Sequence, residues 1–401
     1  MSLFGHCSYQ QTIALFLYKL LQWLVLKFTY KLRTTYPVKV AQRPYFIFLF
    51  ISHTQRHPST TSSTNYTRTR HNPSPLADLS RLKMGCGIGS ILTTPRNEYK
   101  VLKKLGEGGQ GKAFLVRRIR YKGRKEGSSG ALVVCKEEKR GDSVEVRILR
   151  EVLAGRNKRI PEFFEAGTGH GNSLIFLEYC NAGDLHEVIE WYYEHNRSIP
   201  EGFVWTVFCH LSEALAYLHK GFPDRVGDRW DTVLHRDIKP PNVFLTWPHG
   251  RRKYPDVLLG DFGMAALPSD PDFDPENDGG TYEWQPPEAP KTSTRADVWA
   301  LGAIIHACCN GGPPISPKPR DYGGTYRSWC RQPGAKKPTN IYPRYSWSLQ
   351  NWMTRALKKE TLDRISSYEL ATLMVPGDGR TGRLCSSSEL AEGSIRRNPY
   401  L

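Results

Sequence analysis

A glycine-rich segment marks the first part of the 401-residue chain that could do chemistry. Gly106, Gly108 and Gly111 have the spacing GxGxxG. A backbone without Cβ atoms can approach phosphate oxygens closely, so this spacing indicates phosphate binding. A dinucleotide-binding fold requires a helix directly after such a loop, but the residues that follow Gly111 predict a second strand. The segment is therefore expected to be a turn between two strands.

A lysine in the following predicted strand could reach the same phosphate. Lys136 ends the apolar run 133–136, 25 residues after Gly111. Glu145 follows in a stretch where apolar residues recur at helical spacing. A carboxylate fixed on a helix can hold the ammonium against α- and β-phosphate oxygens, whereas a free lysine would lose conformational entropy on binding. A lone lysine at a strand end would be an ordinary charge, so this interpretation depends on the pair.

The most specific pattern lies further along the chain. His235-Arg236-Asp237 precedes Lys239 and Asn242, and Asp261-Phe262-Gly263 begins nineteen residues after Asn242. Either tripeptide occurs by chance in many chains, but chance does not explain both in this order downstream of the glycine-rich segment and the lysine. On these motifs the chain resembles the eukaryotic protein kinases over residues 99–375.

The resemblance implies a serine/threonine protein kinase, which transfers the γ-phosphate of Mg·ATP to hydroxyls of protein substrates. Asp237 would accept the substrate proton or orient the hydroxyl, and Lys239 would neutralise charge on the transferred group. Lys239 together with Thr281 resembles serine/threonine rather than tyrosine kinases. The implied catalytic residues are Asp237, Lys239, Lys136 and Glu145, and the implied Mg²⁺ ligands are Asn242 and Asp261.

The resemblance also implies an ATP-binding site. Leu177 would be the gatekeeper, and the Glu178 carbonyl and Cys180 amide would bind adenine. Asp184 would either reach the ribose or cap the next helix, and Phe244 would form the floor under the adenine. The implied nucleotide-binding residues are Leu105, Gly106, Gly108, Gly111, Ala113, Val134, Lys136, Glu178, Cys180, Asp184 and Phe244.

Two structural contacts are expected around this site. Glu288 should pair with Arg364, and Asp297, on a buried helix, should brace the catalytic loop. The segments 174–180, 242–245 and 259–263 are similar to the NIMA-related kinases, but residues 280–288 depart from that group's usual segment.

Other departures affect the ATP site. Ala113 stands where kinases usually have valine and Val134 where they usually have alanine, so the two changes are opposite in volume and could leave the pocket filled. Lys136 and Glu145 are separated by about half the usual interval, which predicts a helix with a trimmed first turn. Pro241 replaces the glutamate found in many kinases that prefer upstream arginine, which weakens a preference for basic substrates.

The segment between Gly263 and Gly280 bears on regulation. Arg236 could be neutralised by a phosphorylated residue, but Ser269 is the one hydroxyl residue there. Fixed carboxylates could partly replace a phosphate, or the segment could be a solvated acidic loop. The acidic residues are Asp270, Asp272, Asp274, Glu276 and Asp278.

The periodicity of apolar residues predicts the strands and helices that must position these residues. Strands are predicted over 99–105, 113–119, 131–136 and 174–179, and helices over 142–154, 201–219, 295–309 and 347–357. The predicted fold is α+β and two-lobed, with a small β-rich N-lobe (99–179) carrying one regulatory helix and a larger, mainly helical C-lobe (180–375). The insertions 221–233 and 247–256 are expected to be surface loops, with a docking role as the alternative.

The ends of the chain differ from this middle part. Residues 1–77 hold nine Lys and Arg and no acid, so much of the net charge of +17 lies there and is weak evidence for nucleic-acid binding. The basic extension 1–98 is expected to be disordered, and it could be a transit peptide, a membrane-surface helix or an artefact upstream of Met84. Gly85 with Cys86 could be acylated or form a flexible tail. Residues 376–401 are expected to be a flexible tail.

The composition limits the remaining alternatives. The nine cysteines have no zinc spacing, which favours free thiols in a reducing compartment over a disulfide framework. We therefore expect an intracellular, cytoplasmic or nuclear enzyme, monomeric in its catalytic domain, with ATP and Mg²⁺ as cofactors, protein substrates and no specific nucleic-acid partner. Membrane contact would occur only through the N-terminal region. The rival hypothesis is a pseudokinase scaffold that binds nucleotide and partners without phosphoryl transfer.

Overall fold

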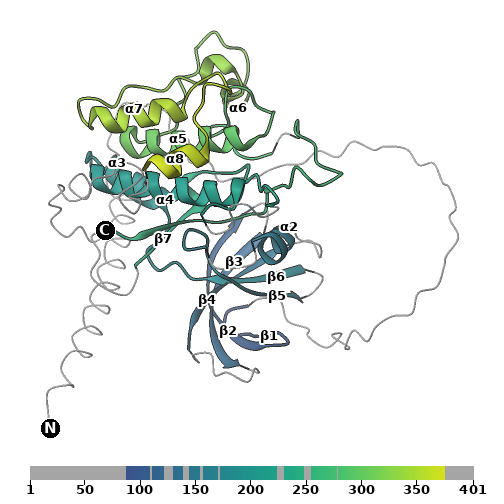
Figure 1. Ribbon diagram of the computed structural model, residues 1–401. Helices are drawn as coiled ribbons and strands as arrows, with labels where there is room; N and C mark the ends of the chain where they lie inside the picture. The colour runs from purple at the N-terminus through teal and green to yellow at the C-terminus, as the bar shows by residue number, and fades with distance from the viewer. Residues whose placement is uncertain are drawn as a thin grey trace, which may run out of the picture. The chain divides into compact units, whose positions relative to one another are not determined.

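The strands predicted near the start of residues 99–375 form one antiparallel sheet (Figure 1). The computed structural model describes residues 87–108, 111–121, 130–138, 144–153, 157–169, 172–223, 230–247, 254–277 and 279–374, all in one structural unit. Gly85, Cys86, the tail 376–401 and parts of both predicted insertions lie outside these residues. None of the helices within them is long and apolar enough to cross a membrane.

The sheet of the N-lobe contains six strands in the order β1-β2-β3-β4-β6-β5. They are β1 (Ile91–Thr93), β2 (Asn97–Gly108), β3 (Gly111–Tyr121), β4 (Leu132–Glu138), β5 (Phe163–Gly169) and β6 (Asn172–Glu178).

Alternation along β4 separates the two faces of this sheet. Val133 and Cys135 are buried in an apolar cluster with Phe176, whereas Val134 and Lys136 are half-buried on the opposite face. The register pairs Lys136 with Ala113 and Val134 with Leu177, and residues paired directly across a ladder share a face. One face therefore carries the lysine and three apolar side chains that are not part of the N-lobe core.

The helix that carries Glu145 is short. α2 (Val144–Arg147) continues as a π-helical segment, η1 (Ile148–Val152), in which the Leu153 amide donates to the Ile148 carbonyl at 2.9 Å. Ile148 and Leu149 are buried in the main core of the molecule. The described part of this helix starts at Val144, and residues 139–143 lie outside the described residues. The trimmed first turn therefore stays a prediction.

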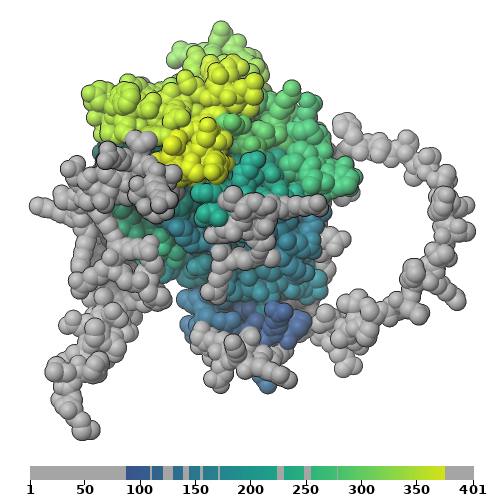
Figure 2. Space-filling view, in the orientation of Figure 1, coloured from purple at the N-terminus to yellow at the C-terminus, as the bar shows by residue number. Residues whose placement is uncertain are grey.

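Helices make up most of the C-lobe. They are α3 (Leu185–Glu194), α4 (Glu201–Lys220), α5 (Thr294–Asn310), α6 (Tyr326–Cys330), α7 (Trp347–Ala356) and α8 (Ser367–Met374), with the 3₁₀ turns η2 (Pro240–Asn242) and η3 (Pro333–Ala335) and the two-stranded sheet of β7 (Val243–Thr246) and β8 (Asp256–Leu259). In the space-filling view, the blue residues of the N-lobe lie at one end and the green and yellow residues of the C-lobe at the other, with teal residues from the middle of the chain between them (Figure 2).

Burial and capping explain the two long helices of this lobe. α4 and α5 bury residues around most of their circumference, so they form the centre of the core rather than a surface layer. The Ser293 hydroxyl accepts a hydrogen bond from the Ala296 amide at the start of α5. Gly311 ends α5 with a φ of +78°, and a side chain at this position would collide with the Tyr193 ring.

The two-lobed α+β fold is confirmed, with local differences from the predictions. All four predicted strands are present, but β1, β5, β7 and β8 were not predicted. β1 lies within the extension 1–98, so the expectation of disorder is wrong for this part of it. β5 contains two glycines in seven residues, which weakens a strand pattern. α3, α6 and α8 were also missed. Five and eight residues are too few for clear helical periodicity in α6 and α8, whereas the buried residues of α3 recur at helical spacing and could have predicted it.

Candidate active site

Lys136 lies at the centre of a cluster of carboxylates. Its Nζ forms ion pairs with Glu145, with Asp261 Oδ1 at 2.6 Å and with Glu138 at 3.2 Å. Burial alone would lower the pKa of Lys136, but these three carboxylates raise it above its usual value. Lys136 is therefore a permanent cation. Glu138 was missed from the sequence, although it is two residues beyond Lys136 and hence on the same face of β4.

Glu145 connects this cluster to the segment after β8. Its side chain is fully buried, and its Oε1 accepts a hydrogen bond from the Phe262 amide at 3.2 Å. Asp261 has a φ of +65°, a conformation that a non-glycine residue adopts only when its surroundings hold it there. Burial raises the pKa of Asp261, but Lys136 more than offsets this and lowers it below the usual value. Asp261 is therefore an anion beside the lysine.

Asp237 is the centre of a second polar set. Its Oδ1 accepts a hydrogen bond from the Thr281 hydroxyl at 2.8 Å, and its Oδ2 lies 2.8 Å from Lys239 Nζ. Lys239 Nζ also donates to the Thr281 hydroxyl at 3.0 Å. Asn242 Nδ2 donates to the Asp237 carbonyl at 2.8 Å and to Oδ2 at 3.2 Å. The carboxylate, the ammonium and a hydroxyl thus meet at one point.

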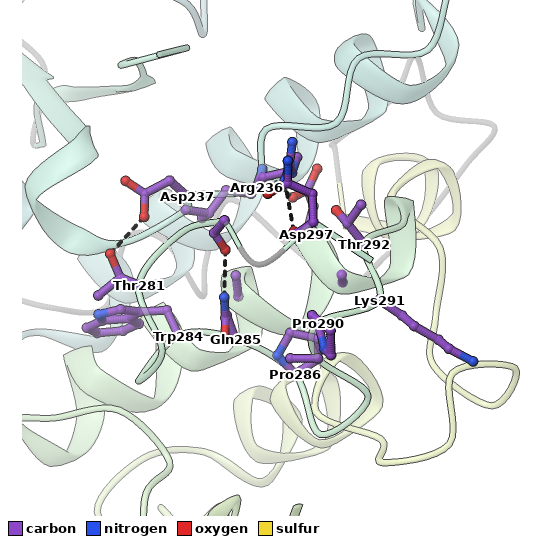
Figure 3. Close-up of a pocket in the computed structure, with 16 residues that line it drawn as sticks. Arg236, Asp237, Thr281, Trp284, Gln285, Pro286, Pro290, Lys291, Thr292 and Asp297 are labelled. Atoms are coloured by element: carbon purple, nitrogen blue, oxygen red, sulfur yellow. Dashed lines mark hydrogen bonds between the residues drawn. The ribbon is translucent and has the colours of Figure 1, made fainter. Parts of the chain in front are cut away.

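The loop that brings Thr281 to Asp237 depends on a close backbone approach. Gly280 has a φ of +88°, and a side chain there would collide with the Arg236 carbonyl. The close-up shows Thr281 directed at Asp237, beside a small pocket that Trp284 and Gln285 also line (Figure 3).

A buried carboxylate holds the backbone of the segment 235–237. Asp297 of α5 accepts hydrogen bonds from the amides of His235 at 2.9 Å and Arg236 at 3.0 Å, and His219 Nε2 lies 3.0 Å away. Burial raises the pKa of Asp297, but the hydrogen bond and charge of His219, with further contributions from His235, lower it below its usual value. This confirms the predicted brace of the catalytic loop.

The predicted pair of Glu288 and Arg364 is also confirmed. The two guanidinium nitrogens Nη1 and Nη2 lie 2.7 and 2.9 Å from the two carboxylate oxygens. Arg364 is buried, and Nη1 also donates to the Arg295 carbonyl at 2.8 Å. This bidentate contact joins the segment after Thr281 to the loop between α7 and α8.

The glycines of the loop between β2 and β3 have two different roles. A Cβ on Gly106 or Gly108 would meet no atom within 4 Å, whereas a Cβ on Gly111 would collide with the Glu137 carbonyl. Gly111 is therefore required by the packing of β3 against β4. Gly106 and Gly108 leave their backbone open to a ligand.

The other predicted nucleotide-binding residues lie around the hinge. Leu105 is 40% exposed at the loop, Glu178 ends β6, and Cys180 follows it. Burial raises the pKa of the Cys180 thiol to about 12, so it is neutral. Phe244 packs against Gly260, where a Cβ would stand 2.9 Å from its ring.

Asp184 performs one of the two roles expected of it. Its Oδ1 accepts a hydrogen bond from the Glu187 amide at 3.0 Å and caps α3. Burial raises the pKa of this carboxyl to about 6. Contact with a ribose stays a prediction.

The acidic segment after Gly263 makes a contact with α2 that the sequence did not predict. Arg236 donates to the Asn277 carbonyl at 3.0 Å, and Asp270 forms an ion pair with Arg147 of α2 at 2.5 Å. Arg147, together with Asp270 and Asp274, lines a pocket of about 680 Å³ between α2 and this segment. The charge of Asp274 also acts on Arg236. The hypothesis that carboxylates of this segment partly replace a phosphate therefore stays a prediction.

The fold and this geometry define a class of protein, and comparison with known families agrees. The model of the protein kinase domain matches residues 99–373, and the chain belongs to this family. Its distant homologues are NIMA-related serine/threonine kinases.

Three of these relatives show the extent of the similarity. Serine/threonine-protein kinase Nek2 of Homo sapiens is 31% identical over 288 residues, Nek1 of Toxoplasma gondii 32% over 236, and the G2-specific protein kinase nim-1 of Neurospora crassa 30% over 252. The alignments cover 68%, 55% and 55% of this chain, but 58%, 14% and 27% of the respective relatives. The chain thus spans less than two thirds of the length of each.

Proposed function

We propose that this chain transfers the γ-phosphoryl group of Mg·ATP to serine and threonine hydroxyls of proteins. The observation that carries the proposal is the convergence of Lys136, Glu145 and Asp261. They come from a strand, a helix and the segment after β8, and Asp261 lies 125 positions beyond Lys136. A cation fixed by one carboxylate beside a second carboxylate suits a phosphate group that carries a metal ion.

The acceptor side of the reaction is supported by the hydrogen bonds of Thr281. Its hydroxyl donates to Asp237 and accepts from Lys239, which is the arrangement that a substrate hydroxyl requires. In the proposed reaction the substrate oxygen forms a bond to the γ-phosphorus while the bond from that phosphorus to the β–γ bridging oxygen breaks. Asp237 takes the hydroxyl proton, and Lys239 stabilises charge on the transferred group.

The residues present fit a magnesium site completed by phosphate. Asp261 offers a carboxylate. Asn242 donates from its Nδ2 to Asp237, so its side-chain oxygen Oδ1 points away from Asp237 and could bind a metal ion. The described residues contain no group of three or more His, Cys, Asp or Glu arranged around a metal ion. Mg²⁺ commonly uses one or two protein oxygens and phosphate oxygens. When bound, it would neutralise phosphate charge.

The nucleotide would lie against the face of the sheet that carries Lys136. Ala113, Val134 and Leu177 share this face by register, and Asp261 contacts the lysine from the other lobe. The open backbone at Gly106 and Gly108 would accept the phosphates. In this arrangement the main chain of Glu178 and Cys180 would bind adenine, and Phe244 would lie under it.

Phosphoryl transfer from labelled Mg·ATP to a mixed library of Ser and Thr peptides tests the proposal. The full chain is compared with Asp237→Asn and Lys136→Met, and thermal melting of each variant checks that it folds. We expect label on peptides from the wild type and a loss of at least about 100-fold in both variants. Nucleotide binding without any transfer would instead favour the pseudokinase scaffold.

A further inference from the structure

Two arginines converge on one tyrosine beside the acceptor site. The guanidinium carbons of Arg327 and Arg331 each lie 4.3 Å from the centroid of the Tyr282 ring. Both side chains also donate to the Tyr282 hydroxyl, Arg331 at 2.9 Å. Arg327 belongs to α6, and Arg331 is the residue directly after it. Both arginines are exposed to solvent.

Tyr282 places this cluster next to the proposed acceptor site. Tyr282 directly follows Thr281, whose hydroxyl contacts both Asp237 and Lys239. The Tyr282 carbonyl accepts a hydrogen bond at 2.7 Å from Lys336, which is buried. Tyr282 is therefore fixed at its main chain by one cation and at its ring and hydroxyl by two more.

Electrostatics indicates what such a site would bind. Tyr282 supplies a ring face and a hydroxyl, which orient the two guanidinium groups. Glu283 contributes one nearby negative charge and acts on Lys336. Burial lowers the pKa of Lys336 to about 8, so it stays largely cationic at neutral pH. Two oriented, solvent-exposed guanidinium groups suit a carboxylate or a phosphate group, which each can bind in a bidentate manner.

We propose that Arg327 and Arg331 form a subsite for an acidic or phosphorylated side chain of the protein substrate. The proposal rests on the proposed kinase function, because the acceptor hydroxyl must lie at Asp237. Because Tyr282 directly follows Thr281 and an extended peptide advances about 3.4 Å per residue, the anionic side chain would stand within a few residues of the acceptor.

Peptide pairs that differ in one residue test this subsite in the full chain. Each peptide has one acceptor serine and one varied position, which lies one to four residues before or after that serine. The varied residue is alanine, aspartate, phosphoserine or lysine, and a phosphoserine cannot accept a second phosphate. We expect kcat/KM about five- to tenfold higher for an anionic residue than for alanine at one or two positions, through KM. Comparison of the aspartate and phosphoserine peptides shows whether the subsite prefers a carboxylate or a phosphate group.

Three variants make the test specific. Arg327→Gln/Arg331→Gln should abolish the preference, and Arg327→Glu/Arg331→Glu should reverse it toward lysine. Lys358→Gln/Lys359→Gln removes two exposed charges elsewhere and should keep the preference. If either double variant fails to melt cooperatively, the single variant Arg327→Gln replaces it and should weaken the preference. A wild type that prefers alanine or lysine, or a glutamine variant that keeps the preference, would overturn the proposal.

A binding measurement separates this subsite from the kinase function. Fluorescence anisotropy of the same labelled peptides needs no phosphoryl transfer. If no peptide receives phosphate but the anionic peptides bind more tightly and lose this advantage in the glutamine variant, the kinase function fails and the subsite stands. Equal binding of the aspartate, phosphoserine and lysine peptides would overturn the subsite whether or not transfer occurs.

Discussion

The two sides of the candidate active site carry opposite excesses of charge. On the side of the sheet, the single cation Lys136 faces three carboxylates within 3.2 Å. On the side of α6, the two guanidinium groups of Arg327 and Arg331 meet at the Tyr282 hydroxyl. The first arrangement suits a metal ion with phosphate, and the second suits an anionic segment of a protein. The difference teaches that opposite charge excesses can equip one site for two chemically different substrates.

Removing one of the three carboxylates around Lys136 should have the largest effect on activity. Asp261→Asn leaves Lys136 paired with Glu145 but removes the carboxylate proposed to bind Mg²⁺. We expect kcat to fall by about 100-fold or more, and the Mg²⁺ concentration for half-maximal rate to rise. Steady-state kinetics across a magnesium titration measures both. Asp363→Asn, at an exposed aspartate, is the matched control, and an unchanged magnesium dependence in Asp261→Asn would refute the assignment.

Arginines in different surroundings should differ in their effect on stability. Arg364→Ala leaves Glu288 without its buried bidentate partner, and we expect the free energy of unfolding to fall by about 3–5 kcal/mol. Arg327→Ala removes an exposed charge and should cost less than about 1 kcal/mol. Urea denaturation followed by tryptophan fluorescence measures both. Equal losses would mean that burial does not distinguish the two arginines.

Acid should weaken the brace of the catalytic loop. The pKa of Asp297 is below its usual value of 3.8 in the folded chain, so this group stabilises the fold above that value. Its contribution is lost as pH falls below the unfolded pKa and through the lower folded one. Asp297→Asn should therefore lower Tm at pH 7 and flatten the dependence of Tm on pH between 5 and 3. A variant whose Tm falls with acid as steeply as the wild type would contradict this.

The ion pair between Arg147 and Asp270 should have the smallest effect. Both side chains are partly exposed, so Asp270→Asn should reduce kcat about two- to fivefold by loosening α2. The exchange Arg147→Asp/Asp270→Arg should restore part of the loss. Because Asp270 needs no modification, phosphatase treatment should leave wild-type activity intact. Activity that disappears after that treatment would show that a phosphate, rather than this carboxylate, orders the segment.

Local motifs allowed much of the site to be predicted from the sequence. Asp237, Lys239 and Asn242 lie within six residues, so one loop conformation brings them together. The pairing of Lys136 with Glu145 was also predictable, because a strand and a following helix bring them within reach even at a spacing of nine residues. Glu138 could have been added from the period of two along β4.

Contacts between exposed side chains could not be predicted in this way. Arg147 and Asp270 are 123 positions apart, and Arg327 and Tyr282 are 45 apart. None belongs to an apolar pattern or a short motif, so only the packed fold brings them together. The π-helical form of η1 was equally hidden, because the apolar face of 145–153 is compatible with either helix type.

The most direct test of the account is the transfer step in Asp237→Asn. This variant keeps the size of the side chain and its oxygen facing Thr281, but it lacks the carboxylate that would accept the proton. Single-turnover transfer to a serine peptide should slow by at least about 100-fold, while the Kd for Mg·ATP changes less than about threefold. Transfer at the wild-type rate in a variant that binds nucleotide normally would contradict the proposed role of Asp237 and, with it, the mechanism.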